Sequence, residues 1–191
     1  MDKKELLESL AEEIRNCKKC PLWKTRSKAV PGQGNHNAKL FFCGEGPGYY
    51  EDRCGEPFVG RAGELLNKLL SLIGIKRSDV FISNVVHCRP PNNRAPTQAE
   101  IKKCKPYLNK QLEIIKPKIV CTLGIPATQT ILGKEVKMKD VHGKPIKTLR
   151  FVVFPTYHPA AALRNPNLEK VLREDFKRLR DLYKTLDAKN G

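Results

Sequence analysis

The stretch LFFCGEGPG at residues 40–48 is a short apolar run that passes directly into a glycine-rich loop. A continuous apolar run of this kind is typical of a strand buried on both faces, as in a parallel sheet. Three further short apolar runs follow, namely VFISNVV at 80–86, IVCTLG at 119–124 and FVVFPTYH at 151–158. We therefore expect four buried strands.

Amphipathic helical patterns lie before, between and after these runs. They cover residues 2–16, 61–74, 97–115, 126–133 and 167–186. Thr97 followed by Glu100 has the form of a capping box at the start of the third of these helices. Strands that alternate with helices predict an α/β fold of three layers, α/β/α, in which helices cover both faces of a mainly parallel four-stranded sheet.

The chain of 191 residues has no composition break or linker, so we expect a single domain over residues 1–191, and a monomer. Residues 187–191 are expected to form a frayed tail. No apolar run approaches the roughly 20 residues that a membrane-spanning helix needs. The charged N-terminal stretch lacks the features of a secretion signal, which predicts a cytoplasmic protein without a membrane partner.

Lysine and arginine outnumber aspartate and glutamate by 36 to 20, so the formal net charge is +16. This excess indicates a polyanionic partner such as nucleic acid. A solvated, lysine-rich surface is the alternative explanation, and charge alone does not separate the two. Aromatic residues make up only 7% of the chain, which argues against a broad base-stacking platform for single strands.

Seven cysteines are not expected to form disulfides, because the cytoplasm keeps thiols reduced and an odd number cannot pair fully. Cys17 and Cys20 form a C-x2-C pair that can bind one metal centre from a tight turn. Cys88 and Cys104 could complete a set of four thiolates. Such a set suits zinc or an iron–sulfur cluster, and the spacing does not choose between them.

The three remaining cysteines have simpler explanations. Cys43 and Cys121 lie in apolar runs, where free cysteine behaves as a small hydrophobic residue. Cys54 lies in the loop EDRCGEP as an exposed thiol, or as a competing metal ligand if the set of four is wrong.

Ligands of open α/β sheets bind at the carboxyl ends of the strands. Three loops should therefore form the site: GEGPG at 44–48, the segment that begins at Asn84, and HPAAALR at 158–164. Glycine-rich loops in the first position also bind dinucleotide phosphates, but the G-x-G-x-x-G pattern is incomplete here and Pro47 argues against it.

Four motifs occur in one order: GEGPGYYED at 44–52, GEPFVGRAG at 55–63, NVVHCRPPNNRAP at 84–96 and TYHPAAALR at 156–164. Together they resemble the family 4 uracil-DNA glycosylases, from the first cysteine pair to about residue 175. The resemblance implies a base excision repair enzyme that flips uracil out of single- or double-stranded DNA and hydrolyses its N-glycosidic bond. It also implies a [4Fe–4S] cluster, mainly structural, on Cys17, Cys20, Cys88 and Cys104.

The resemblance assigns the uracil pocket to Gly44, Glu45, Gly46, Phe58, Asn84 and His158. Asn84 would donate to O4 of uracil and accept from N3–H, whereas cytosine presents the opposite donor and acceptor at these positions. Phe58 would stack on the flipped base. Without the motifs, a turn cap would be the favoured explanation of Asn84, and core packing would be the alternative for Phe58.

Two catalytic roles follow from the same resemblance. His158 matches the residue that donates a hydrogen bond to O2 as negative charge develops on the departing uracil. Glu45 matches an acidic position that stabilises the sugar cation or orients the attacking water. Better-known uracil glycosylases have an aspartate one position later, where this chain has Gly46, so no dedicated base for the water is evident.

The candidate DNA contacts are Arg61, Arg89, Arg94, Leu163 and Arg164. The arginines would meet phosphates, and Leu163 or a neighbour would enter the minor groove and fill the space left by the flipped base. A plain helix start is the alternative for the run after His158. Replication or repair proteins would be further partners.

Several other titratable residues are given no role in the site. Glu51 and Asp52 are expected to lie in a solvated turn. His36, His87 and His142 are expected to be surface or loop histidines.

Two competing functions are compatible with part of the sequence. A nonenzymatic nucleic-acid-binding module held together by zinc would explain the charge and the cysteines, but it leaves Glu45, Asn84 and His158 without a role. Family 5 uracil-DNA glycosylases accept other damaged bases and lack a polar residue at the position of Glu45. The presence of Glu45 favours family 4.

Overall fold

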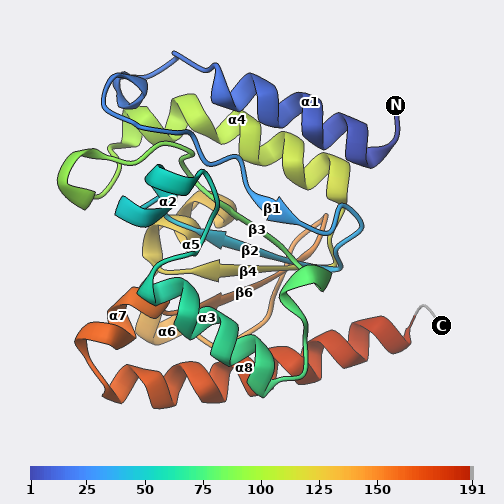
Figure 1. The fold of residues 1–191 in the computed structure, drawn as a ribbon. Helices are drawn as coiled ribbons and strands as arrows, with labels where there is room; N and C mark the ends of the chain where they lie inside the picture. The colour runs from blue at the N-terminus through green and yellow to red at the C-terminus, as the bar shows by residue number, and fades with distance from the viewer. Residues whose placement is uncertain (190–191) are drawn as a thin grey trace.

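The computed structural model describes residues 1–189 and has the predicted three-layer α/β fold (Figure 1). Its central parallel strands, in spatial order, are β3 (Phe81–Asn84), β2 (Leu40–Gly44), β4 (Ile119–Leu123) and β6 (Val152–Thr156). The short strands β1 (Gln33–Gly34) and β5 (Ile146–Lys147) pair antiparallel with the two edges. Within the described residues the sheet therefore has six strands and not four, because two-residue edge strands leave no apolar pattern in the sequence.

Helices cover both faces of the sheet (Figure 1). One face packs against α1 (Lys3–Arg15), α4 (Gln98–Ile115) and α5 (Ile125–Leu132), and the other against α3 (Arg61–Leu72) and α8 (Asn167–Ala188). These five helices agree with the predicted ranges to within two residues at either end. The shorter helices are α2 (Tyr49–Cys54), α6 (Met138–Val141) and α7 (Pro159–Arg164), with 3-10 turns at Pro21–Lys24, Arg77–Asp79 and Pro91–Asn93.

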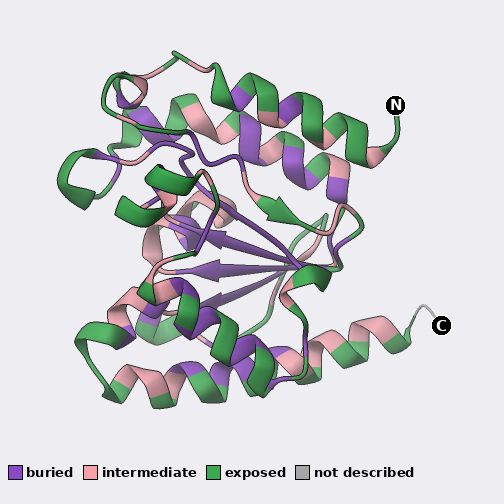
Figure 2. Ribbon diagram, in the orientation of Figure 1, coloured by how far each residue is buried: buried purple, intermediate pink, exposed green. Residues whose placement is uncertain are grey.

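All five residues of strand β2 are buried. Because successive side chains of a strand point to opposite sides, both faces of β2 are therefore covered. Phe42 stacks on Phe176 of α8 with ring centroids 5.9 Å apart, whereas Phe41 stacks on Phe81 on the other face at 5.5 Å. Full burial of one such side chain contributes about 1.5–3 kcal/mol. Figure 2 shows the same pattern in the neighbouring central strands and in the inward faces of the helices.

The C-terminal helix is longer than expected. α8 continues to Ala188, and Asp187 forms an ion pair with Lys39, the residue before β2. The prediction of a frayed tail from residue 187 is therefore wrong for its first two residues, because this ion pair ties the helix end to the sheet. Residues 190 and 191 of that predicted tail lie outside the described part of the chain.

The parallel strands all end at one edge of the sheet, where β2, β3 and β6 pass into the three loops that the sequence singled out and β4 passes into a fourth loop at Gly124. No helix in residues 1–189 is both long enough and apolar enough to cross a membrane.

The start of α4 has the predicted capping box. The Thr97 hydroxyl accepts from the Glu100 N–H at 3.2 Å, and the Glu100 carboxylate accepts from the Thr97 N–H at 2.8 Å. The Arg94 guanidinium also binds this carboxylate and holds the pKa of Glu100 below its usual range. The cap therefore fixes the loop before α4 as well as the helix itself.

We predict that Thr97→Ala lowers the free energy of unfolding by about 1 kcal/mol, because one N–H at the start of α4 loses its acceptor. Thr97→Ser keeps the hydroxyl and should stay close to the parent protein. Denaturant titration followed by circular dichroism measures both variants. Equal midpoints for Thr97→Ala and the parent protein would show that the hydroxyl does not stabilise the helix.

Candidate active site

A cleft lies at the carboxyl edge of the sheet. Its walls come from the loops that follow β2, β3, β4 and β6, and its lining includes Glu45, Gly46, Arg94, Gly124, His158 and Arg164. Segments far apart in the sequence thus meet where open α/β sheets bind their ligands.

Asn84 and Gly44 are register partners at the ends of β3 and β2. A Cβ atom on Gly44 would lie 2.5 Å from Asn84 Oδ1 and 2.8 Å from the Phe58 ring, so only glycine allows these groups to approach one another. Asn84 is 1% exposed, and within the described residues its Oδ1 has no hydrogen-bond partner. A buried acceptor without a partner costs about 1–3 kcal/mol, and a ligand N–H would remove that cost.

Phe58 has an unusual backbone conformation, with φ of 50°. Its side chain is buried in the core cluster that includes Leu66 and Phe154. Its ring also stacks on His158, with centroids 5.4 Å apart and planes 24° apart. The Phe58 side chain therefore packs in the core and also contacts the predicted site residue His158.

His158 forms the N-cap of α7, where its Nδ1 accepts from the Ala160 N–H at 3.0 Å. Burial lowers the pKa of His158 to about 4, against the partial compensation of the negative charge on Glu51. Because Nδ1 is an acceptor, the neutral ring carries its proton on Nε2. His158 is therefore a neutral hydrogen-bond donor near pH 7.

Glu45 lines the same cleft, and burial raises the pKa of its carboxyl group. Its carbonyl oxygen accepts from the Val86 N–H at 3.2 Å, which ties the loop after β2 to the loop after β3. A Cβ atom on Gly46 would lie 2.8 Å from Val86 Cγ2. A larger residue at position 46, such as an aspartate, would require Val86 to move.

A buried carboxylate binds β6 just before the turn that carries His158. Asp175 of α8 accepts from the Thr156 hydroxyl at 2.7 Å and lies 2.9 Å from His142 Nδ1. His142 is therefore a loop histidine with a structural partner, and its ring also contacts Tyr157. Sequence reasoning missed Asp175, because an acidic residue in a charged amphipathic helix carries no sign that it points inward.

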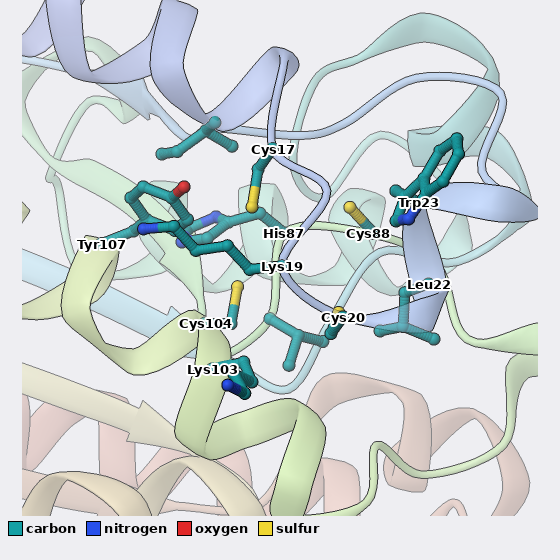
Figure 3. A pocket seen from close by; sticks show the side chains of 12 residues that line it. Cys17, Lys19, Cys20, Leu22, Trp23, His87, Cys88, Lys103, Cys104 and Tyr107 are labelled. Carbon is teal, nitrogen blue, oxygen red and sulfur yellow. The ribbon is translucent and has the colours of Figure 1, made fainter.

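The four cysteines of the predicted set surround one cavity (Figure 3). Cys17 follows α1, Cys20 precedes the first 3-10 turn, Cys88 follows β3, and Cys104 lies in α4. Burial raises the pKa of Cys20, of Cys88 and of Cys104, the last to about 12. In residues 1–189, no three histidine, cysteine or acidic side chains gather closely enough to hold a single metal ion.

The environment of the cavity distinguishes this set from the other cysteines. Arg26 donates to Cys88 Sγ at 3.3 Å and to the Cys17 carbonyl at 2.9 Å. As predicted, Cys43 and Cys121 are buried in the core and Cys54 is exposed. Cys54 does not line the cavity.

The prediction of a solvated turn for Glu51 and Asp52 is wrong. Asp52 is 3% exposed and accepts from the Ser27 N–H at 2.8 Å, and Glu51 binds backbone N–H groups of two loops. His87 is a loop histidine as predicted, but it is buried, with Nδ1 3.0 Å from the Val30 carbonyl oxygen. The local composition around Glu51 and Asp52 resembles that of a solvated turn and does not reveal the backbone groups that these carboxylates bind.

The candidate DNA contacts lie at or near the cleft. Arg94 and Arg164 line it, although Arg94 is also paired with Glu100. Leu163 is 40% exposed on α7, so the run after His158 is a helix start that also presents this side chain to solvent. Arg61 is exposed at the start of α3, and Arg89 lies over the Tyr49 ring.

Comparison with known proteins identifies the family. The family model described as the uracil DNA glycosylase superfamily matches residues 31–182. The chain belongs to this superfamily. It is 51% identical over 185 residues to a type-4 uracil-DNA glycosylase of Sulfurisphaera tokodaii, covering 92% of this chain and 84% of the relative. It is 50% identical over 184 residues to that of Saccharolobus solfataricus, covering 92% and 85%.

Within the superfamily, the similarity is greater to type 4 than to type 5. A type-5 uracil-DNA glycosylase of Pyrobaculum aerophilum is 28% identical over 186 residues, covering 80% of this chain and 82% of the relative. The resemblance to family 4 that the four motifs indicated is thereby confirmed.

We predict that His158 stays neutral, with its proton on Nε2, down to about pH 4. Its folded-state pKa lies below the usual value of about 6.5, so its contribution to stability is complete above about pH 6.5 and decreases between that pH and about 4. NMR of the imidazole nitrogens as a function of pH measures both the tautomer and the midpoint. A midpoint near 6.5, or a proton on Nδ1, would contradict the assignment.

Proposed function

We propose that this member of the uracil-DNA glycosylase superfamily flips uracil out of DNA and hydrolyses its N-glycosidic bond, which releases uracil and leaves an abasic site. The observation that carries the proposal is the buried Asn84 Oδ1, which has no partner in the described residues and lies beside Gly44 and Phe58. Uracil N3–H is a donor of the kind that this atom lacks.

Base recognition follows from the orientation of one amide. With Oδ1 accepting from N3–H, the Asn84 amino group donates to O4 of uracil. Cytosine has an acceptor at N3 and a donor at position 4, so both contacts would become repulsive, and buried groups would lose their partners. Gly44 and Gly46 allow the base to approach the backbone of the loop after β2, and Phe58 stacks on it.

Bond cleavage places opposite charges on the two fragments. Negative charge develops on O2 and N1 of the departing uracil, and His158 Nε2–H donates to O2 as it does so. Removal of one such preorganised donor typically costs about 10²–10³-fold in rate. The sugar becomes positively charged, and the Glu45 carboxylate stabilises that cation or orients the attacking water.

DNA binding supplies the free energy that base flipping requires, a few kcal/mol. Arg61, Arg89, Arg94 and Arg164 bind phosphates, and Leu163 fills the space that the flipped base leaves. Arg94 must share its guanidinium between Glu100 and DNA.

We propose a [4Fe–4S] cluster on Cys17, Cys20, Cys88 and Cys104. The support for this group is that all four cysteines line one cavity, and four thiolates are the ligand set that such a cluster takes. These cysteines would hold the cluster between the end of α1, the loop after β3 and α4, and its role would be structural, because uracil hydrolysis needs no electron transfer. We further propose a cytoplasmic monomer of one domain over residues 1–191, with replication or repair proteins as partners.

The direct test of the function is release of free uracil from oligonucleotides that contain one deoxyuridine, in single-stranded and in duplex form. Purified protein with its iron content measured beforehand should release uracil and leave a site that alkali cleaves. Specific binding without release would favour the nonenzymatic module, and release of other damaged bases but not uracil would favour the activity of family 5.

We predict that Asn84→Asp lowers kcat/KM on uracil by about a hundredfold or more, because a carboxylate cannot donate to O4 and its buried charge lacks a partner. Discrimination between uracil and cytosine should fall with it. Asn37→Asp makes the same chemical change at an exposed position and should leave both quantities as they are. Unchanged discrimination in Asn84→Asp would remove Asn84 from base recognition.

We predict that Cys104→Ser loses bound iron and the visible absorption of the cluster, and has a lower Tm, because the cluster then lacks one thiolate. Cys54→Ser, which alters an exposed cysteine outside the cavity, should keep both iron and Tm. Full iron content in Cys104→Ser would mean that the set of four ligands is wrong.

A further inference from the structure

Glu51 is bound entirely to backbone. One carboxylate oxygen accepts from the Gly48 N–H at 3.0 Å, and the other accepts from the N–H groups of Val59 and Gly60 at 3.0 and 2.9 Å. None of the ion pairs in residues 1–189 includes Glu51. A carboxylate that accepts several backbone N–H groups forms charge-assisted bonds, which are roughly twice as strong as neutral ones.

The two glycines allow this approach. A Cβ atom on Gly48 would lie 2.8 Å from Glu51 Oε1, and one on Gly60 would lie 3.4 Å from Oε2 and 3.2 Å from the Tyr50 ring. The carboxylate thus connects the start of α2 to the loop at residues 55–60, which carries Phe58.

That loop needs to be held, because the φ of 50° at Phe58 is unfavourable for a bulky residue by about 1–2 kcal/mol. Glu51 binds the N–H groups directly after Phe58, and Arg77 donates to the carbonyl oxygens of Pro57 and Phe58. Gly63 of α3 lies so close that a Cβ atom there would be 1.9 Å from the Phe58 carbonyl oxygen. Hydrogen bonds therefore hold the backbone at Phe58 itself, at the residue before it and at the two residues after it.

We propose that Glu51 is a positioning residue, which holds Phe58 in this conformation and so keeps its ring against His158 and beside Asn84. The inference rests on the proposed function, because the base would stack on the Phe58 ring. Errors of about 1 Å in the position of such groups can cost about a hundredfold in rate.

The variant Glu51→Gln keeps the shape of the side chain, but replaces one acceptor oxygen with an NH2 group that cannot accept from an N–H. Glu64→Gln is the matched control, because Glu64 is an exposed carboxylate in the first turn of α3, close to the same loop. Both are made in the complete, iron-loaded protein.

The first measurement, amide hydrogen exchange, needs no activity. The single oxygen of the glutamine can face only one side, so either the Gly48 amide or the Val59 and Gly60 amides should exchange at least about tenfold faster in Glu51→Gln than in the parent. They should be unchanged in Glu64→Gln. Normal exchange in Glu51→Gln would overturn the proposal. If the parent protein released no uracil, the proposed function would fail, yet this measurement would still decide whether Glu51 holds the loop.

The second measurement is a double-mutant cycle on uracil excision with Glu51→Gln and Phe58→Ala. Glu51→Gln alone should lower kcat by roughly tenfold to a hundredfold with little change in KM. In the Phe58→Ala background its effect should shrink to within about threefold, because the ring that it positions is gone. An equal loss in both backgrounds would show that Glu51 acts directly on His158 or on DNA, and would overturn the positioning role.

Discussion

The burial of strand β2 on both faces is the constraint on which the rest of the molecule depends. No charged side chain can point out of such a strand, so polar chemistry has to begin where the strand ends, at Gly44 and Glu45. Parallel pairing then brings the end of β3, with Asn84, to the same edge. The cleft therefore follows from strand direction and register, before any catalytic residue is considered.

Much of this arrangement could be predicted from the sequence. Continuous apolar runs identified the four central strands, and helical periodicity identified the five long helices, because both patterns report burial directly. The cysteine set and the residues of the cleft came from motifs in a recognisable order, since spacing alone left zinc and iron–sulfur chemistry equally open. In the structure the four cysteines line one cavity, and Glu45, Gly46 and His158 line one cleft, whereas Gly44, Phe58 and Asn84 are not among the residues that line it.

The rest depends on contacts between distant residues, which local patterns do not contain. Glu51 and Asp52 resemble a solvated turn in sequence, yet both carboxylates bind backbone N–H groups. His87 gave no sign of its burial, and the end of α8 carries an ion pair between Asp187 and Lys39. The partners of Asp52, His87 and Asp187 lie 25 or more residues away, and those of Glu51 are backbone groups, so residue type and spacing reveal neither.

The cysteine cavity and the cleft share the segment between β3 and α4, since Cys88 follows Asn84 by four residues and Arg94 binds Glu100 within α4. The same segment therefore contributes both to the cysteine cavity and to the cleft. At the start of this segment, the buried Asn84 Oδ1 has no hydrogen-bond partner among residues 1–189. An apolar residue of similar size in its place would relieve a desolvation cost, but it could not make the contacts proposed for base recognition. Under the proposed function, stability and recognition therefore make opposite demands on a single atom.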